Sequence, residues 1–405
     1  MNRRAFLGTL PVLGVGGPSV RSFSSYPAAP PNGPVLRREL FPDPIFLESV
    51  DLLRHEDSFL CRVRSSEGAE GWSVANNYQQ KYLWPIQTLR VNPFFVGKDA
   101  RDLDALIDGV YTYRSNYKLQ SLALWVPVAT VEFAILDLLG KIAGLPLGKL
   151  LSPTLHNPEI KVYQANNHRG KSAEESLDRI VAGVAETGAE AVKFKVAGRM
   201  NDPDLPAGRS ERLIPLVRRA LGDDMTLYAD ANSGYDIEQA VRIGHLMADH
   251  GYDFFEEPIA FDRYTELRQV KDRVGVPLAG GEQEASMNNF RYLIEQDVLA
   301  YVQPDLFYFG GMVRSMRVAR MAAARGQRCV PHISGAGLGF LYMAHFVSAL
   351  PNAGPYHEFK AGVNEVPYEV PGGGMEVREG KIRVPEGAGL GVVLDPDFVS
   401  KHRVV

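Results

Sequence analysis

Cysteine is nearly absent from this chain of 405 residues, which contains only Cys61 and Cys329. Two thiols so far apart in the chain cannot form a disulfide scaffold or a cysteine-based zinc site, and we expect both to be unpaired and buried. An excess of one charge is also lacking. The formal net charge is −4, which argues against a protein dedicated to nucleic-acid binding. What is present is ordinary for a globular protein: 45% hydrophobic and 23% charged residues, enough for a large core.

Acidic residues are missing from the N-terminal segment, where Glu39 is the first. Arg3 and Arg4 precede an apolar run over 5–15, too short to span a bilayer, and a proline-rich stretch follows. This layout is typical of a secretory signal, and the arginine pair resembles the twin-arginine export signal of bacteria. We predict that residues 1–30 are an export signal and linker of a periplasmic protein with no membrane contact after export. The alternative is a disordered basic tail on a cytoplasmic protein.

Eight β-rich runs alternate with amphipathic helical stretches between residues 156 and 360. The runs are 161–166, 191–196, 226–232, 252–257, 277–282, 300–305, 328–333 and 354–359. The first helix is well marked, because Ser172 and Glu175 form a capping box and Gly188 is placed to end the helix. Strands that alternate with helices indicate parallel βαβ units, and eight units predict a TIM-type α/β barrel over 156–360. A doubly wound sheet is the competing architecture.

The flanking segments follow a different pattern. Residues 31–155 indicate a smaller α+β domain, with strands expected at 49–51 and 59–64 and helices at 100–113 and 128–143. Residues 361–405 form a C-terminal tail, in which we expect a short hairpin around the dipeptide Glu379-Gly380.

Three of the predicted strands end in an acid. These acids are Asp230, Glu256 and Glu282, spaced evenly at one strand-plus-helix repeat. On adjacent strands they would lie at the C-terminal rim of the barrel, where barrel active sites form. Converging carboxylates repel unless a cation lies among them, and oxygen ligands suit Mg²⁺. We predict that these three bind Mg²⁺ and that Asn232, on the same face as Asp230, lies beside the substrate. Alternatively, each acid caps the next helix or pairs with a surface base.

Two lysines lie one strand earlier. Strand alternation places Lys193 and Lys195 on one face and their apolar neighbours on the other, so both ammonium groups would point into the barrel. Burying these ammonium groups is costly unless an anion pairs with them. Burial beside another cation also lowers the pKa of a lysine, which makes it a usable base near neutral pH. The alternative is an edge strand with two solvated lysines.

The last strands add an imidazole and further acids. Asp305 and His332 end neighbouring strands, where Asp305 can accept a hydrogen bond from one ring nitrogen and strengthen the other as a base. A lone histidine is more often a core residue, but its place in this ring favours catalysis. Glu358, on the final strand, is a candidate general acid or substrate ligand, or a structural residue.

These motifs together resemble the enolase superfamily, and specifically its mandelate-racemase-like branch. The resemblance rests on Lys193-x-Lys195, Asp230-x-Asn232, Glu256-Glu257-Pro258, Gly281-Glu282, Asp305 and His332 in the family's order. It implies a modified (β/α)7β barrel and an α+β capping domain to which the C-terminal tail returns. It further implies that Asp230, Glu256 and Glu282 are Mg²⁺ ligands. Lys195 would then be one base, Lys193 its partner, and the His332–Asp305 pair the base on the opposite face.

The resemblance implies removal of the proton next to a substrate carboxylate. Among its reactions we favour dehydration of a sugar acid, because polar residues crowd 76–82 and 166–169. Within these segments His168 and Arg169 are candidate substrate-binding residues, and Lys81 is a second candidate for holding a carboxylate. A racemase, epimerase or cycloisomerase with the same bases is the alternative, and a non-catalytic sugar-acid binder is a third. The expected partner is a small-molecule carboxylate, and a homo-oligomer is the default.

Overall fold

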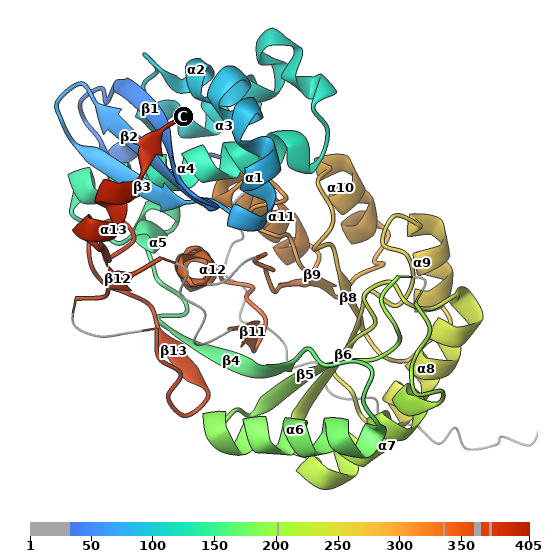
Figure 1. The fold of residues 1–405 in the computed structure, drawn as a ribbon. Coiled ribbons are helices and arrows are strands. Elements are labelled where there is room, and N and C mark those ends of the chain that lie inside the picture. Colours follow the sequence, from blue (N-terminus) through green and yellow to red (C-terminus); the bar gives the residue numbers. More distant parts are fainter. Residues whose placement is uncertain (1–32, 201, 335–336, 360–365, 372–374) are drawn as a thin grey trace, which may run out of the picture.

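The computed structural model describes residues 33–200, 202–334, 337–359, 366–371 and 375–405. The export signal predicted for residues 1–30 lies outside this range and stays a prediction. Within the described residues, a capping domain sits on one end of a curled sheet that is wrapped by helices (Figure 1).

The curled sheet holds the eight parallel strands. In chain order they are β4 (Glu159–Asn166), β5 (Ala191–Lys195), β6 (Thr226–Asp230), β7 (Phe254–Glu256), β8 (Leu278–Gly280), β9 (Tyr301–Val302), β10 (Arg328–Cys329) and β11 (His357–Glu358). They hydrogen-bond in the order β10-β9-β8-β7-β6-β5-β4-β11. A bridge between Cys329 and Ala353 joins β10 to the segment before β11 and closes the ring. The predicted barrel is confirmed, and the doubly wound alternative is wrong.

Seven helices connect these strands, as the (β/α)7β pattern requires. They are α6 (Ala173–Thr187), α7 (Arg209–Leu221), α8 (Ile237–Asp249), α9 (Tyr264–Lys271), α10 (Met287–Glu295), α11 (Met312–Ala323) and α12 (Leu338–Ser348). The capping box predicted at Ser172 and Glu175 is present, and Gly188 ends α6 in the left-handed conformation. Local sequence signals and tertiary packing therefore agree where α6 begins and ends.

The later strands are shorter than predicted, and this changes how the site is built. The predicted runs 277–282, 300–305 and 328–333 each continue beyond the strand that forms. Gly281 takes a φ of +107° directly after β8, and a Cβ there would lie 2.6 Å from the ring of Phe290. Glu282 is therefore carried on a turn, not on the strand itself.

The capping domain is built on an antiparallel sheet. Its strands are β1 (Leu47–His55), β2 (Ser58–Ser65) and β3 (Glu70–Val74), and the C-terminal β15 (Arg403–Val404) pairs with β1. The sequence predicted β1 and β2 in part and missed β3. The helices are α1 (Asn77–Ile86), α2 (Asn92–Phe95), α3 (Leu103–Thr112), α4 (Leu122–Ala143) and α5 (Leu147–Leu151).

Helix α4 is the core of this domain and begins earlier than the predicted 128–143. It is the one helix of the described residues that is long and apolar enough to cross a membrane, but 89% of its most apolar window is buried in the protein. Its apolar character is therefore explained by packing between the cap sheet and the barrel.

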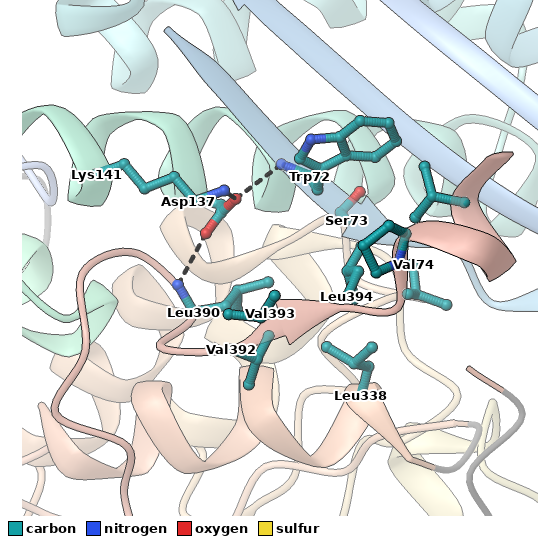
Figure 2. Close-up of a pocket in the computed structure, with 12 residues that line it drawn as sticks. Trp72, Ser73, Val74, Asp137, Lys141, Leu338, Leu390, Val392, Val393 and Leu394 are labelled. Carbon is teal, nitrogen blue, oxygen red and sulfur yellow. Dashed lines mark hydrogen bonds and ion pairs between the residues drawn. The ribbon is translucent and has the colours of Figure 1, made fainter. Parts of the chain in front are cut away.

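The C-terminal tail is anchored to α4 through a buried carboxylate. Asp137 accepts hydrogen bonds from the backbone N–H of Trp72 in β3 at 2.8 Å and of Leu390 in the tail at 2.9 Å (Figure 2). Lys141 pairs with the same carboxylate at 2.6 Å. The tail then runs through β14 (Val393–Leu394) and α13 (Pro396–Lys401) to β15 in the cap sheet.

The predicted hairpin in the tail forms only at its turn. Arg378 and Lys381 exchange backbone hydrogen bonds around Glu379-Gly380. The second arm, β13 (Lys381–Arg383), pairs antiparallel with β4 of the barrel, while no strand forms over 375–377. The partner of β13 is thus set by tertiary packing.

Candidate active site

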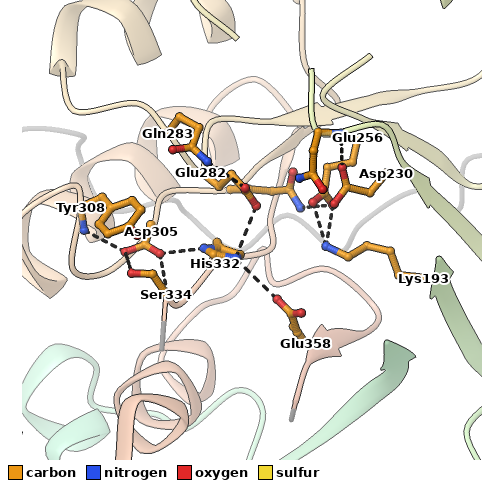
Figure 3. A network of polar contacts seen from close by, with 12 residues as sticks. Lys193, Asp230, Glu256, Glu282, Gln283, Asp305, Tyr308, His332, Ser334 and Glu358 are labelled. Atoms are coloured by element: carbon orange, nitrogen blue, oxygen red, sulfur yellow. Dashed lines mark hydrogen bonds and ion pairs between the residues drawn. The ribbon is translucent and has the colours of Figure 1, made fainter. Parts of the chain in front are cut away.

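Three buried carboxylates lie at the ends of neighbouring barrel strands. Asp230 ends β6 and Glu256 ends β7, and the two residues are direct partners in the parallel ladder. Glu282 follows β8 on the next strand along. Asp230 and Glu256 are fully buried and Glu282 is 6% exposed. The strand register therefore places these acids together at the C-terminal rim, as their spacing predicted (Figure 3).

Both lysines of β5 point into the barrel toward these acids. Lys193 donates to both carboxylate oxygens of Glu256, at 2.8 and 2.9 Å, and Lys195 pairs with Asp230. Gln303, which sequence reasoning did not single out, donates to Glu256 Oε2 at 2.8 Å. The sequence feature that could have identified Gln303 is its position two residues before Asp305, because side chains two residues apart at a strand end lie on the same face.

The electrostatics of the acids follow from burial and from these lysines. Burial raises the pKa of Glu256 to about 7, against the pull of Lys193 and with the help of the Asp230 and Glu282 charges. Burial also works to raise the pKa of Asp230, but the charges of Lys195 and Lys193 outweigh it and hold that pKa below its usual range. Burial therefore disfavours the ionised form of both acids, and the charges of the two lysines favour it.

The donor set fits a hard divalent cation. Three buried carboxylates from adjacent strands supply oxygen ligands of the kind Mg²⁺ prefers, and their mutual repulsion is a load that a cation relieves. Among the described residues, no three His, Cys, Asp or Glu side chains already stand in a metal-binding geometry. In the structure Lys193 pairs with Glu256 and Lys195 pairs with Asp230.

His332 lies at the other end of the row, beside Glu282. Its Nδ1 donates to Asp305 Oδ2 at 2.7 Å, as predicted, and its Nε2 lies 3.4 Å from Glu282 Oε2 and 3.7 Å from Glu358 Oε2. Burial alone would lower the pKa of His332, but the charge of Glu282 and the hydrogen bond to Asp305 outweigh it and raise that pKa to about 9. Glu358 itself is buried on β11.

The capping domain reaches the His332–Asp305 pair through Ser334. The Ser334 N–H donates to Asp305 Oδ2 at 2.6 Å, and Asn76 Nδ2 donates to the Ser334 hydroxyl at 2.8 Å and carbonyl at 3.1 Å. Asn76 is also the N-cap of α1, accepting from Gln79 N at 3.2 Å. Sequence reasoning placed 76–82 against a substrate and missed this contact with the barrel.

The rest of segment 76–82 is divided. Gln80 is buried and donates to Gln87, and Gln79 donates to the hydroxyl of the barrel residue Tyr308 at 3.4 Å. Tyr78 and Tyr82 are 71% and 69% exposed, and the Lys81 ammonium lies 5.0 Å from both ring centroids. Lys81 lines an outer pocket with His55 and Phe398, away from the row of acids. This placement gives no support to the suggestion that Lys81 holds a substrate carboxylate, which stays a prediction.

The remaining candidates lie on the loops after β4 and β6. Asn232 is buried, and its N–H donates to Asp230 Oδ1 at 2.7 Å. The Arg169 guanidinium donates to Asn232 Oδ1 at 2.9 Å, and His168 is exposed. Asn232 thus lies beside a candidate ligand, whereas Arg169 is engaged with the protein itself.

Comparison with known proteins identifies a family to which this chain is similar. Residues 175–398 match the family model described as enolase C-terminal domain-like. The chain is 25% identical to D-galactarolactone cycloisomerase of Agrobacterium fabrum, with 85% of this chain and 91% of the relative covered. It is also 25% identical to arabinonate dehydratase of Saccharolobus solfataricus, with 84% and 89% covered.

A solved structure shows the same fold. A mandelate racemase/muconate lactonizing protein from Paracoccus denitrificans, determined in complex with magnesium, superposes with a TM-score of 0.78 at 24% identity, covering 89% of this chain and 99% of that one. The match to the family model over residues 175–398, more than half of the chain, shows that the chain belongs to the enolase superfamily, and its solved structural neighbours are mandelate racemase/muconate lactonizing enzyme-like proteins. The two curated relatives named above are a sugar-acid dehydratase and a cycloisomerase.

Proposed function

We propose that this protein is a Mg²⁺-dependent acid-sugar dehydratase. It removes the proton α to a substrate carboxylate and then eliminates the β-hydroxyl as water, giving a 2-keto-3-deoxy acid. The observation that carries the proposal is the placement of two candidate bases at opposite ends of one row of acids. Lys195 pairs with Asp230 at one end. His332 lies beside Glu282 at the other (Figure 3).

Asp230, Glu256 and Glu282 would hold the ion, which supplies positive charge for the negative charge that develops on the substrate carboxylate oxygens. Lys195 accepts the α-proton at its Nζ. Lys193 stays paired with Glu256 and keeps that carboxylate ionised and oriented. His332 donates a proton from Nε2 to the departing hydroxyl, while Asp305 holds Nδ1–H. Asn232 and Glu358 border the space between the two bases.

The test is a panel of aldonic and aldaric acids assayed with MgCl₂ for 2-keto acid. Lys195→Ala and His332→Asn should each lower turnover by roughly 10²–10⁴-fold with the fold retained. Lys161→Ala, at an exposed lysine on β4, is the matched control and should keep turnover. Wild-type turnover in either site variant would remove that residue from the mechanism.

A cycloisomerase, racemase or epimerase is the second candidate, favoured by the similarity to D-galactarolactone cycloisomerase. Those reactions use the same two bases but form no 2-keto acid. Solvent deuterium entering the α-carbon without keto-acid formation would establish this alternative. Substrate binding that neither turns over nor responds to EDTA would instead point to a non-catalytic binder.

A further inference from the structure

The end of β5 has a backbone partner on only one side. Its ladder with β6 continues to the pair Lys195–Asp230, but its ladder with β4 stops at the pair Phe194–Asn166. Lys195 therefore lies one residue beyond the last β4 contact. The carbonyl groups that follow need other donors, because buried backbone carbonyls are nearly always hydrogen-bonded.

Arg209, the first residue of α7, supplies one set of donors. Its side chain is buried, with 3% exposure, and Nη1 donates to the Lys195 carbonyl at 2.9 Å. Nη2 donates to the His168 carbonyl and to the Ser176 hydroxyl, both at 3.2 Å. One guanidinium thus ties the end of β5 to the loop after β4 and to α6.

Arg169, on that same loop, supplies the second set. Its Nε donates to the Ala197 carbonyl at 3.2 Å, and Nη2 approaches the Val196 carbonyl at 3.5 Å. The same Nη2 donates to Asn232 Oδ1 at 2.9 Å, and Asn232 in turn donates its N–H to Asp230. The two arginines therefore meet the carbonyls of three successive residues that begin at Lys195, and Arg169 also links them to the strand of Asp230.

The choice of residue is informative. Burying a guanidinium is costly unless its N–H groups are hydrogen-bonded. The Nη atoms of Arg209 and the Nε and Nη2 atoms of Arg169 donate to carbonyl, hydroxyl and amide oxygens, whereas Arg209 Nε has no partner among the described residues. The planar fork spans acceptors on different elements at fixed angles, which a lysine cannot reproduce. Arg209 lies where the sequence showed only an amphipathic helix, and Arg169 was expected to bind substrate.

We propose that Arg169 and Arg209 are positioning residues that hold the backbone at the end of β5, and with it the Lys195 ammonium, against the row of acids. This inference rests on the role proposed above for Lys195 as a base. Neither arginine touches the reacting atoms. They act by fixing the position of the Lys195 ammonium group relative to the bound substrate.

The test compares Arg209→Lys and Arg209→Met with Arg218→Met in the full chain. Arg218 is a matched control because it lies on the same helix and also donates to backbone carbonyls, including His250 at 2.8 Å and Gly251 at 2.7 Å. Those carbonyls belong to the turn before β7, at the other end of the barrel. Arg169→Gln provides a second site variant should Arg209→Met fail to fold.

Two readouts are expected to separate positioning from general stability. With the favoured substrate, Arg209→Lys should lower kcat by about 10²-fold with KM nearly unchanged, as a misplaced catalytic group does. Without substrate and in EDTA, trace trinitrobenzenesulfonate labelling followed by peptide mapping should modify Lys195 several-fold faster than in the wild type. Lys161 should label at the wild-type rate, and Arg218→Met should lower the melting temperature while keeping both kcat and Lys195 labelling.

The outcomes distinguish this inference from the proposed function. If Lys195 labelling and kcat in the Arg209 and Arg169 variants change no more than in Arg218→Met, the positioning role is refuted. If Lys195→Ala keeps turnover while Lys195 labelling still rises in Arg209→Lys, the base assignment is wrong and the positioning of this strand end stands.

Discussion

The buried pair between Lys193 and Glu256 yields a prediction that can be tested without a substrate. Lys193 is 3% exposed and Glu256 is fully buried, and both carboxylate oxygens accept from the ammonium. Lys193→Met keeps the aliphatic stem and removes the charge. Glu256 then loses two charge-assisted hydrogen bonds and keeps only Gln303 among the donors described here.

The expected loss in the free energy of unfolding depends on the Glu256 carboxyl group that Lys193→Met leaves without its partner. Removing one partner of a buried ion pair typically destabilises a protein by about 3–5 kcal/mol. Because burial already raises the pKa of Glu256 to about 7 beside Lys193, the carboxyl group left behind takes up a proton at pH 7, and the loss should lie toward the lower end of that range. The double variant Lys193→Met/Glu256→Gln leaves no stranded charge, so it should recover most of that loss. Glu256→Gln alone should be costly too, because it leaves a buried ammonium facing an amide.

The measurement is urea unfolding at pH 7 in EDTA, followed by tryptophan fluorescence and circular dichroism. EDTA removes any contribution of a bound divalent ion, so the cycle reports the pair alone. A Lys193→Met loss below about 1 kcal/mol, the value of an exposed pair, would refute the reasoning that this interior is dry and the pair buried.

Three further predictions follow from other buried polar groups. Burial lowers the pKa of His345 and His357 to about 4. As pH falls, the two histidines take up protons in the unfolded chain at about pH 6.5, before they do so in the folded protein. Their contribution to the free energy of unfolding should therefore be complete above about pH 6.5 and decrease toward pH 4. His345→Gln should remove about 3 kcal/mol of the stability lost between about pH 6.5 and pH 4, and an unchanged loss over that range would contradict it. Burial raises the pKa of Glu132, which accepts from the Val313 N–H at 2.8 Å, to about 8. This group's contribution is full below about pH 4.5 and is lost as pH rises through 8, so melting curves of Glu132→Gln should gain on the wild type over that window. Asn76→Ser keeps the helix cap but loses the amide donor to Ser334, so it should lower kcat while holding the melting temperature. A kcat equal to that of the wild type would show that Asn76 does not act on the His332–Asp305 pair.

Much of the fold and of the candidate site could be predicted from local sequence patterns. The alternation of strands and helices predicted the barrel, because each βαβ unit is specified within a short stretch of chain. The even spacing of Asp230, Glu256 and Glu282 predicted their meeting, because parallel strands in register bring equivalent positions to one rim. The strand alternation that places Lys193 beside Lys195 predicted that both point inward.

Contacts between distant segments were not legible in the same way. Nothing local marks Arg209 or Arg169 as partners of the Lys195 strand, because their acceptors are ordinary backbone carbonyls. The role of Asn76 depends on how the cap docks, and the pairing of β13 with β4 depends on where the tail passes.

The amino-acid sequence alone therefore determined the kind of fold and the chemical groups at its centre. Periodicity and spacing act through neighbouring residues and repeat units, and they are readable without coordinates. Tertiary structure alone decided which acid each lysine pairs with, which arginines hold the Lys195 strand, and which cap residue contacts Ser334 beside Asp305. Those contacts join residues far apart in the chain, and their geometry depends on how whole elements pack against one another.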